Sequence, residues 1–470
     1  MPIHWSLLEQ GHWLSEKTRM SFQTPPSLLD LAVQSLVRNE ALAISALEEL
    51  PGLLFPPLFL EAFTRRHRRV LTAMVQAWPF TRLPLGSLMK TGDLKTLKAV
   101  LDGLDALLAQ KVRPRRWNLQ VLELGDVDGD FRSVWYGGAE CSSEAMKKRR
   151  TTNDSAGTGR QRPVVVSADL SLTEGNLDPC LTYLVQWVRN RKDALHLCCR
   201  KLVISEIAFL NVSEVLEVVD LDCVREVEVD CSPELSPEPV FAPYLGQMSN
   251  LGKLVLCNIF VCPLSSPKEK EQIVARFTSQ LFKLHNLREL AVYTGSFLVF
   301  CLHQVLRCLE TPLETFLMTK CLLSTSDWEN LSSWPSISQL KELRLGGIIL
   351  AHLSPEPLSL LLEKIAATVQ SLFLENCGIM DSQLNVIVPA LSRCCQLTTL
   401  SFRGNFLSRA SLEHLLRHTA RLSKLRLEVY PAPLESYDAR GVLDSRKYEQ
   451  FRAELTEILR GIRKPKKIVF

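Results

Sequence analysis

The chain has 470 residues, of which 46% are hydrophobic and 23% charged, ordinary proportions for a globular protein with a buried core. Its 55 Lys+Arg and 51 Asp+Glu leave a net charge of +4, which is too small to indicate nucleic acid or an anionic membrane as the partner. The 14 cysteines show no CxxC spacing, which argues against a zinc cluster, and we expect reduced, mostly buried thiols.

Residues 1–20 form an N-terminal extension that lacks the basic start and apolar run of a signal peptide. No window of the chain reaches the roughly 18 apolar residues that a membrane span requires. We therefore expect a cytoplasmic protein, with the nucleus as a second location and no membrane as a partner.

Residues 21–118 are expected to form a helical cap. Its first helix, within residues 24–43, follows a Pro-Pro pair and begins where Ser27 can cap the first turn, with Asp30 three residues on. The apolar residues form two stripes, one of Leu28, Leu31 and Ala32 and one of Leu29, Val33 and Leu36. Such a helix either covers two surfaces, its own domain and a partner, or is a plain core helix.

The next apolar segment, residues 50–63, places Phe55, Phe59 and Phe63 four residues apart. A stripe of this kind is either packed in a core or covered by a partner, because it is unfavourable in water. Two further helices are expected, one over residues 69–78, ended by Pro79, and one along the leucine stripe of residues 94–108.

Residues 119–127 (LQVLELGDV) are predicted to be the first repeat strand, and residues 128–162 a flexible polar insertion. A basic run within the insertion is either a nuclear import signal or a solvated charge cluster. It consists of Lys147, Lys148, Arg149 and Arg150.

Residues 163–440 contain an internal repeat, the frame LxxLxL followed by Asn, Cys or a small residue, with weaker strands over residues 164–204. The frames start at Val224, Leu251, Leu287, Leu313, Leu340, Val369, Leu397 and Leu422. From Leu287 onward the steps are 26, 27, 29, 28 and 25 residues, long enough for a strand, a turn, a helix and a return. Asn405 stands where its side chain can bond the turning backbone.

Between the frames the apolar period becomes helical, so each unit exposes an apolar face until its neighbour covers it. This forces a stacked array with a parallel sheet. The predicted fold class is α/β, a leucine-rich-repeat solenoid of the ribonuclease-inhibitor-like horseshoe kind with an N-terminal helical cap. Residues 441–470 are predicted to form a C-terminal helix and a basic tail.

The motifs of common catalytic sites are missing from the sequence, which has no GxxxxGK[ST], HExxH or GxSxG. The nine histidines are dispersed, and the basic runs lack interleaved aromatic residues. We therefore expect no enzyme, no cofactor, no metal and no direct binding of nucleic acid. An enzyme would need a pocket with convergent polar groups.

Several long motifs resemble the PRAME family, the preferentially expressed antigen of melanoma and its paralogues. They are SLLDLAVQSL, ELPGLLFPPLFLEAF, MVQAWPFTRLPLG, AVLDGLDALLAQKVRPRRWNLQVLEL, PYLGQMSNL, SPEPLSLLLE, LTTLSFRGN and YPAPLESYD, and they extend from about residue 21 to 438. The resemblance implies a horseshoe of leucine-rich repeats that serves as the substrate-recognition subunit of a cullin 2 RING ubiquitin ligase.

Two docking segments follow from the resemblance. The elongin-binding residues would be Ser27, Leu28, Ala32 and Leu36, with Ala32 in place of the commoner Cys. The cullin-binding residues would be Pro51, Leu53, Leu54 and Phe55. The expected partners are elongin C with elongin B, cullin 2 and an unidentified protein target.

The family is also described as repressing transcription through a leucine motif that contacts a nuclear receptor. Here the corresponding segment reads LTEIL, with Ile458 in place of a leucine, and the intact LxxLL strings at residues 358–362 and 412–416 lie on repeat helices, where core packing is expected. The resemblance thus implies target ubiquitination and degradation, with negative regulation of transcription, differentiation and apoptosis and support of proliferation. The alternative is a stoichiometric binding protein or corepressor that recruits no ligase.

Overall fold

A computed structural model of the chain describes residues 27–90, 93–110, 114–125, 163–172, 178–192, 194–205, 210–230, 238–258, 266–295, 302–462 and 467–470. The chain divides into two compact units. The helical unit comprises Met1–Pro79 and Lys98–Trp117, and the repeat unit comprises Phe80–Leu97 and Asn118–Phe470. The basic run at residues 147–150 and the insertion 128–162 lie outside the described residues.

The helical unit begins with two short helices where the sequence predicted one. They are α1 (Leu28–Arg38) and α2 (Glu40–Ala46), and Asn39 between them accepts a hydrogen bond from the Leu42 amide (3.1 Å) that starts α2. The other elements are η1 (Gly52–Leu54), α3 (Phe55–Thr64), α4 (Arg68–Gln76) and the larger part of α6 (Leu94–Leu108). The helices predicted over residues 69–78 and 94–108 are thereby confirmed.

Aromatic side chains of α3 form the centre of the helical unit. The rings of Phe55 and Phe59 meet the indole of Trp78 edge to face, at centroid distances of 6.1 and 5.3 Å. The Arg116 guanidinium lies over the Phe55 ring and donates hydrogen bonds to the carbonyls of Leu47 (2.7 Å) and Leu50 (2.6 Å). The aromatic stripe of residues 50–63 is therefore core, the first of its two interpretations.

The repeat unit contains two parallel sheets among its described residues. The smaller has the order β1-β2-β3-β5-β7 and the larger β16-β15-β14-β13-β12-β11-β10-β9-β8-β6-β4. The strands are β1 (Arg82–Pro84), β2 (Val121–Glu123), β3 (Val164–Ser167), β4 (Leu170–Leu172), β5 (Leu195–Cys198), β6 (Lys201–Ser205), β7 (Val219–Asp220), β8 (Glu226–Asp230), β9 (Lys253–Cys257), β10 (Glu289–Gly295), β11 (Thr315–Cys321), β12 (Glu342–Gly346), β13 (Ser371–Glu375), β14 (Thr399–Ser401), β15 (Leu427–Val429) and β16 (Lys467–Val469).

The early repeats divide each strand run between the two sheets. In the VVVSADL run, β3 belongs to the small sheet and β4, three residues on, to the large one, and β5 and β6 repeat this arrangement. The strands predicted over residues 164–204 are confirmed. The strand predicted at residues 119–127 is β2, but it is not the first, because β1 precedes it and pairs with it in parallel register.

From β8 onward, each strand begins two residues after a predicted frame start, and neighbouring repeats pair in sequence order. The last frame is the exception. Thr399 pairs with Leu427, so the frame starts at Leu425 and not at the predicted Leu422, and the last step is 28 residues instead of 25. Buried Glu428 then occupies an inward position, where it accepts a hydrogen bond from the Tyr430 hydroxyl (2.7 Å).

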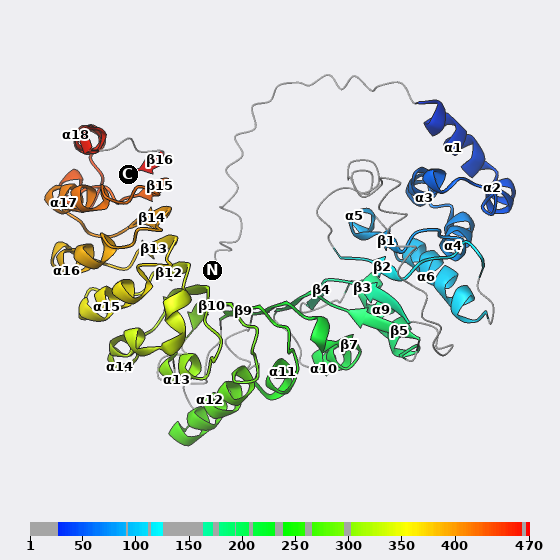
Figure 1. The fold of residues 1–470 in the computed structure, drawn as a ribbon, viewed down its shortest axis with the longest axis horizontal. Helices are drawn as coiled ribbons and strands as arrows, with labels where there is room; N and C mark the ends of the chain where they lie inside the picture. Colours follow the sequence, from blue (N-terminus) through cyan, green and yellow to red (C-terminus); the bar gives the residue numbers. More distant parts are fainter. Residues whose placement is uncertain are drawn as a thin grey trace. The chain divides into compact units, whose positions relative to one another are not determined.

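Helices of the repeats cover one face of the large sheet (Figure 1). The leucines at the first, fourth and sixth frame positions are buried against them, as the burial alternation of β13 shows. The helices of the repeat unit are α5 (Gly86–Met89), α9 (Pro179–Arg189), α10 (Leu210–Leu216), α11 (Glu238–Leu245), α12 (Pro267–Leu281), α13 (Leu302–Arg307), α14 (Thr325–Glu329), α15 (Glu356–Ile365), α16 (Asp381–Leu391), α17 (Arg409–Thr419) and α18 (Ser445–Ile462), with short 3-10 turns η3 (Leu221–Cys223), η5 (Leu331–Ser333), η6 (Pro335–Gln339) and η7 (Leu434–Ser436). No helix among the described residues has the length and apolar character to cross a membrane.

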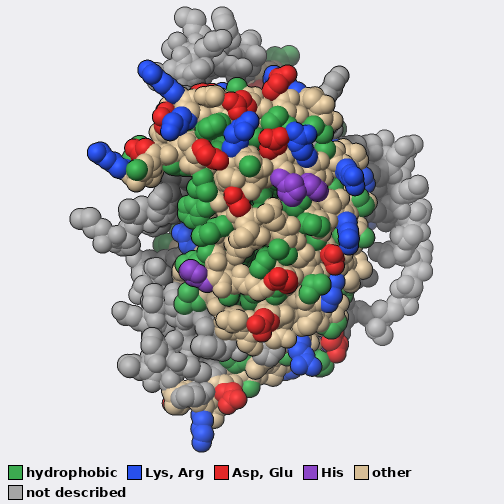
Figure 2. All heavy atoms as spheres, turned by 90° about the vertical axis from the view of Figure 1, so that its left-hand side faces the viewer, with side chains coloured by type: hydrophobic (Ala, Val, Ile, Leu, Met, Phe, Trp, Pro, Cys, Tyr) green, Lys and Arg blue, Asp and Glu red, His purple; other side chains and the backbone are tan. Residues whose placement is uncertain are grey.

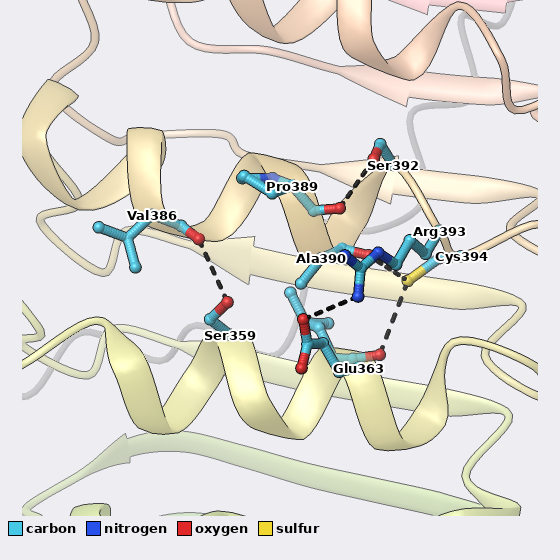
Figure 3. Close-up of polar contacts among 9 residues, drawn as sticks. Ser359, Glu363, Val386, Pro389, Ala390, Ser392, Arg393 and Cys394 are labelled. Carbon is cyan, nitrogen blue, oxygen red and sulfur yellow. Dashed lines mark hydrogen bonds and ion pairs between the residues drawn. The ribbon is translucent and has the colours of Figure 1, made fainter.

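Polar side chains join consecutive repeat helices, as Figure 3 shows for α15 and α16. The Ser359 hydroxyl donates to the Val386 carbonyl (3.2 Å), and Arg393 pairs with Glu363 (3.0 Å). The Cys394 thiol, buried between the repeats, points to the Leu362 carbonyl (4.0 Å). Because these bonds run from one repeat to the next, each helix helps to fix its neighbour.

The end of the chain adds a further strand. The predicted helix of residues 441–470 is α18, but the last residues of the predicted basic tail form β16, which pairs with β15 in parallel register. The Tyr448 hydroxyl donates to the Phe470 carbonyl (2.8 Å), and the Tyr430 and Phe470 rings lie 5.7 Å apart. The pairing with β15 and the packing of Phe470 hold this segment in the sheet, because Val469 is 44% exposed and adds little buried area.

A left-handed backbone conformation recurs in six consecutive repeats, at the last residues of the strand or just after it. The residue seven positions after the frame start has a positive φ in each of them: Asn258, Thr294, Lys320, Gly347, Asn376 and Gly404, with φ from 45° to 71°. Glycine and asparagine adopt this conformation at low cost, whereas threonine and lysine are strained in it. The repeated turn directs the chain out of each strand in the same way.

Gly404 offers a test of how tightly these turns stack. We expect Gly404→Ala to lower the free energy of unfolding by about 1 to 2 kcal/mol more than Gly441→Ala, measured by urea denaturation. Both glycines have a positive φ, but a Cβ at residue 404 would lie only 2.0 Å from the Asn376 Oδ1, whereas one at residue 441 would meet nothing within 4 Å. Equal losses of unfolding free energy in the two variants would show that the Asn376 side chain moves aside at no cost.

Candidate protein-binding surfaces

Helix α1 turns one apolar side into solvent. Val33 and Val37 are buried, whereas Leu28 is 86% exposed and Ala32 is also exposed, with Leu36 half-buried below them. Ser27 caps the helix, because its hydroxyl accepts from the Asp30 amide (3.1 Å) while the Asp30 carboxylate accepts from the Ser27 amide (3.0 Å). The structure thus brings the four predicted elongin-binding residues onto one accessible helical side.

The predicted cullin-binding residues are not all accessible. Leu53 is 78% exposed and Pro51 is exposed, and Leu54 is half-buried. Phe55, in contrast, is fully buried in the core of the helical unit. Its side chain is therefore unavailable to a partner, since sequence spacing alone could not distinguish a docking phenylalanine from the first residue of a core helix.

The sheet face opposite the repeat helices carries a ladder of alternating charges. Glu226 accepts from Lys201 (3.3 Å) and lies 3.7 Å from Lys253, and Lys253 pairs with Glu289 (3.0 Å). Burial lowers the pKa of Lys253, but the hydrogen bonds and charges of Glu289 and Glu226 outweigh it, so this pKa lies above its ordinary value. Because these pairs are partly exposed to water, each contributes about 1 kcal/mol or less to the stability of the fold.

Beside this ladder lies a small apolar cluster, separate from the main core. Val255, Ala291 and Leu317 are neighbours on β9, β10 and β11, and Cys257 and Tyr293 pack against them. On the next two strands, β12 and β13, the Arg344 guanidinium lies 4.0 Å from the centroid of the Phe373 ring. The open sheet face therefore presents both charged and aromatic groups to a protein.

A second apolar surface, which the sequence analysis missed, follows the loops after β11 to β15. Large hydrophobic side chains lie exposed there in successive repeats, namely Leu322, Ile349, Met380, Phe406 and Leu434. We call this set the apolar edge row. The sequence holds a signal for it, because three of the five stand nine residues after the frame starts Leu313, Leu340 and Leu397. Figure 2 shows hydrophobic side chains exposed between acidic and basic ones on the side of the repeats that it views.

The leucine strings considered for a nuclear receptor face the core. Leu358, Leu361 and Leu362 of α15 are buried, as are Leu412, Leu415 and Leu416 of α17. Leu455 and Leu459 of the LTEIL segment are buried as well. The prediction that these leucines serve packing is confirmed for the two LxxLL strings.

The described residues contain no cluster of three or more His, Cys, Asp or Glu side chains arranged to hold a metal ion. Two histidines, His414 and His418, lie one turn apart on α17 with ring centroids at 4.2 Å. Burial and the neighbouring His418 lower the pKa of His414. The His418 Nδ1 lies 3.0 Å from the His414 carbonyl, so the His418 ring is held against its own helix.

The buried thiols offer a test of the core around the repeat turns. Burial raises the pKa of Cys377 to about 11 and that of Cys394 to about 12, so both stay protonated at pH 8. We expect a thiol-reactive reagent at pH 8 to modify exposed Cys395 well before either of them, as read by tandem mass spectrometry. Equal labelling of adjacent Cys394 and Cys395 in the native protein would contradict the packing described here.

Comparison with known proteins gives the family of the chain. The PRAME N-terminal domain model matches residues 25–132, and the PRAME C-terminal domain model matches residues 164–470. The chain belongs to the PRAME family. It is 59% identical to human PRAME family member 12 over 451 residues, which cover 96% of this chain and 93% of the relative. Human PRAME family members 8 and 7 are each 54% identical over 451 residues, covering 96% of this chain and 95% of the relative.

Among solved structures, the crystal structure of a TLR13-ssRNA13 complex matches with a TM-score of 0.25 and 13% identity, over 78% of this chain and 60% of that one. A likeness of this size supports no inference about fold or function. The family assignment therefore rests on the sequence, and the arrangement of the repeats on the strand pairings described above.

Proposed function

We propose that this PRAME family member is a substrate-recognition adapter of a cullin 2 RING ubiquitin ligase. The helical unit would dock elongin C, with elongin B, and cullin 2, while the repeat unit, taken as a leucine-rich-repeat horseshoe, would hold a target protein. The observation that carries the proposal is the exposed apolar side of α1, where Leu28 is 86% exposed on a helix whose other side is buried.

The shape of α1 supports this role. A short amphipathic helix with leucine anchors on its free side is one recurring form in which one protein binds in the groove of another. The Ser27–Asp30 capping box fixes where the helix starts, so Leu28 and Ala32 are presented in a defined register. Order in the unbound chain reduces the entropy lost when a partner binds.

The mechanism of such an adapter is positional. By holding a target beside a ubiquitin-loaded carrier, it raises the local concentration of the target's lysines and thereby accelerates transfer. The adapter needs no catalytic residue of its own for this, and its action would be cytoplasmic or nuclear. Loss of the target would then account for the repression of transcription, differentiation and apoptosis and the support of proliferation that the family resemblance implies.

The second candidate is a stoichiometric binding protein or corepressor that recruits no ligase. Buried Phe55 favours it, because one of the four residues matched to the cullin-binding segment is unavailable at the surface. A chain that binds elongin C but not cullin 2 would fall between the two. The measurement that separates the candidates is mass spectrometry of proteins recovered with the intact chain and with a Leu28 variant, with the proteasome blocked. Cullin 2 that is recovered only with the intact chain supports the ligase adapter.

A further inference from the structure

Two cysteines of the repeat unit occupy the same position in consecutive repeats. In the large sheet Lys201 pairs with Glu226, 25 residues further along the chain, and the same offset separates Cys198 from Cys223. Neighbouring parallel strands lie about 4.8 Å apart, and the Cα atoms of a disulfide usually lie about 4.4 to 6.8 Å apart. Equivalent positions of two stacked repeats are therefore close enough for a bond between their sulfurs.

The local structure directs both thiols to one point. Cys198 ends β5 and is the register partner of Asp220 in the neighbouring strand β7. After Asp220, whose carboxylate accepts from the Asp222 amide (3.2 Å), the turn η3 brings the chain back, and the Cys223 thiol donates to the Asp220 carboxylate (3.5 Å). The thiols of Cys198 and Cys223 thus lie within hydrogen-bond reach of one another.

Both thiols stand where the chain passes from the small sheet to the large one. Cys198 lies between β5 and β6, and Cys223 between β7 and β8, and in each pair the first strand belongs to the small sheet and the second to the large. A bond between the two sulfurs would join the two crossing segments. It would also close a loop of the chain that contains α10.

The adjacent cysteine offers a contrast in access to solvent. Cys198 and Cys223 are half-buried, whereas Cys199 is fully buried and donates to the Lys201 carbonyl (3.1 Å). Burial raises the pKa of Cys199 to about 12. Because small oxidants react faster with accessible thiols, Cys198 should react and Cys199 should not.

We propose that Cys198 and Cys223 form a redox-active dithiol, which closes into a disulfide when a peroxide oxidises the protein and opens again under a thiol reductant. The described cysteines are all free, so this structure shows the reduced form. Reversible disulfides of this kind are the ones that occur in reducing compartments. The inference does not depend on the proposed ligase role.

The oxidation consumes one molecule of hydrogen peroxide in two steps. The Cys198 sulfur attacks a peroxide oxygen, the O–O bond breaks, and the departing hydroxide takes the Cys198 proton, which leaves a sulfenic acid and one water. The Cys223 sulfur then attacks the Cys198 sulfur, and the S–O bond breaks. The second hydroxide takes the Cys223 proton and becomes the second water. Two electrons have passed from the two thiols to the peroxide.

The order of the steps follows from the surroundings of Cys223. Burial, followed by the hydrogen bonds and charges of Cys198 and Asp220, raises the pKa of Cys223, so this thiol keeps its proton at neutral pH. Cys223 is therefore assigned the second step. Its proton can pass to the leaving hydroxide through the Asp220 carboxylate, which the thiol already contacts.

The test uses the full reduced chain, treated with hydrogen peroxide at neutral pH and then with N-ethylmaleimide. Trypsin places Cys198 and Cys199 in the peptide 193–200 and Cys223 in the peptide 202–225. Mass spectrometry without reductant should find these two peptides joined, and dithiothreitol should separate them. Fragment ions that divide Cys198 from Cys199 should assign the linked sulfur to Cys198.

Three variants complete the test. Cys223→Ser should lower the amount of joined peptide at least tenfold and leave a sulfenic acid at Cys198, which dimedone traps. Cys198→Ser should lower it equally. Cys199→Ala, the matched control on the adjacent residue, should give as much joined peptide as the parent chain.

A peptide linked through Cys199 would overturn the proposal. So would undiminished N-ethylmaleimide labelling of Cys198 and Cys223 after peroxide, or disulfides that join two chains in place of the internal one, seen as dimers in non-reducing electrophoresis. If a serine variant fails to fold, the fragment ions of the parent chain decide alone, because they identify both sulfurs without a substitution.

Discussion

Leu28→Asp is expected to reduce the recovery of elongin C with this chain at least tenfold while leaving the fold intact. The 86% exposure of Leu28 means that the aspartate meets only solvent in the free protein, and a negative charge in the first turn of α1 suits the helix dipole. In the complex the same charge would be buried in an apolar groove without a partner, which is costly. Co-purification from cells with the proteasome blocked measures the effect.

Leu360→Asp is the matched control, because Leu360 is a half-exposed leucine on repeat helix α15. It should recover as much elongin C as the parent chain. If Leu28→Asp also recovers an undiminished amount, α1 is not the docking helix and the adapter proposal fails. Circular dichroism of both variants excludes a loss of fold as the cause of any change.

Asn405→Ala should lower the free energy of unfolding by about 3 to 5 kcal/mol, the largest stability loss that we expect from a single polar residue here. The buried Asn405 side chain accepts from the amides of Cys377 (3.2 Å) and Ile379 (3.0 Å) and donates to the carbonyls of Leu374 (2.6 Å) and Phe402 (2.8 Å). Alanine leaves these four groups without partners in the core. Urea denaturation gives the size of the loss.

Hydrogen exchange shows where Asn405→Ala destabilises the protein, since the Cys377 and Ile379 amides should exchange faster in this variant than in the parent chain. Asn330→Ala serves as the control, because the exposed Asn330 side chain bonds only the Ser326 carbonyl (2.8 Å) among the described residues, and its loss should be about 0.5 kcal/mol. A loss of that small size in Asn405→Ala would mean that water replaces the buried amide at little cost.

The strands of the central repeats could be predicted from the sequence because their inward positions are leucine, phenylalanine, methionine or valine. The pattern fails where polar residues take those positions. At the last frame, Leu422, Leu425 and Leu427 satisfy LxxLxL, yet the register pairs Leu427 with Thr399 and places Glu428 inward. A buried glutamate bonded to a tyrosine has no hydrophobic signature, and hence the frame was predicted three residues too early.

Short strands were missed for a related reason. β1 and β16 have three residues each, too few for an alternating pattern to stand out, and their parallel partners fix them more than their own sequences do. The two-sheet arrangement of β3 to β6 likewise depends on pairings between residues far apart in the sequence. Local periodicity gives the presence of a strand but not the sheet to which it belongs.

The candidate docking residues divide in the same way. For α1, the capping signal and the two stripes predicted an accessible side, and Leu28 and Ala32 lie on it. For Phe55, the sequence could not tell burial from exposure, since the residue is the first of α3 and its ring packs against Trp78, far along the chain. The apolar edge row was missed because single exposed residues in loops form a line only once the repeats stack.

The left-handed turn that recurs at Asn258, Thr294, Lys320, Gly347, Asn376 and Gly404 makes the repeats interchangeable as building blocks. A chain cut at two such positions has the same backbone direction at both cut ends, so a whole repeat could be removed or duplicated without a mismatch at the join. Chains built in this way can therefore change length between relatives in steps of one repeat, while the side chains that meet a partner change independently.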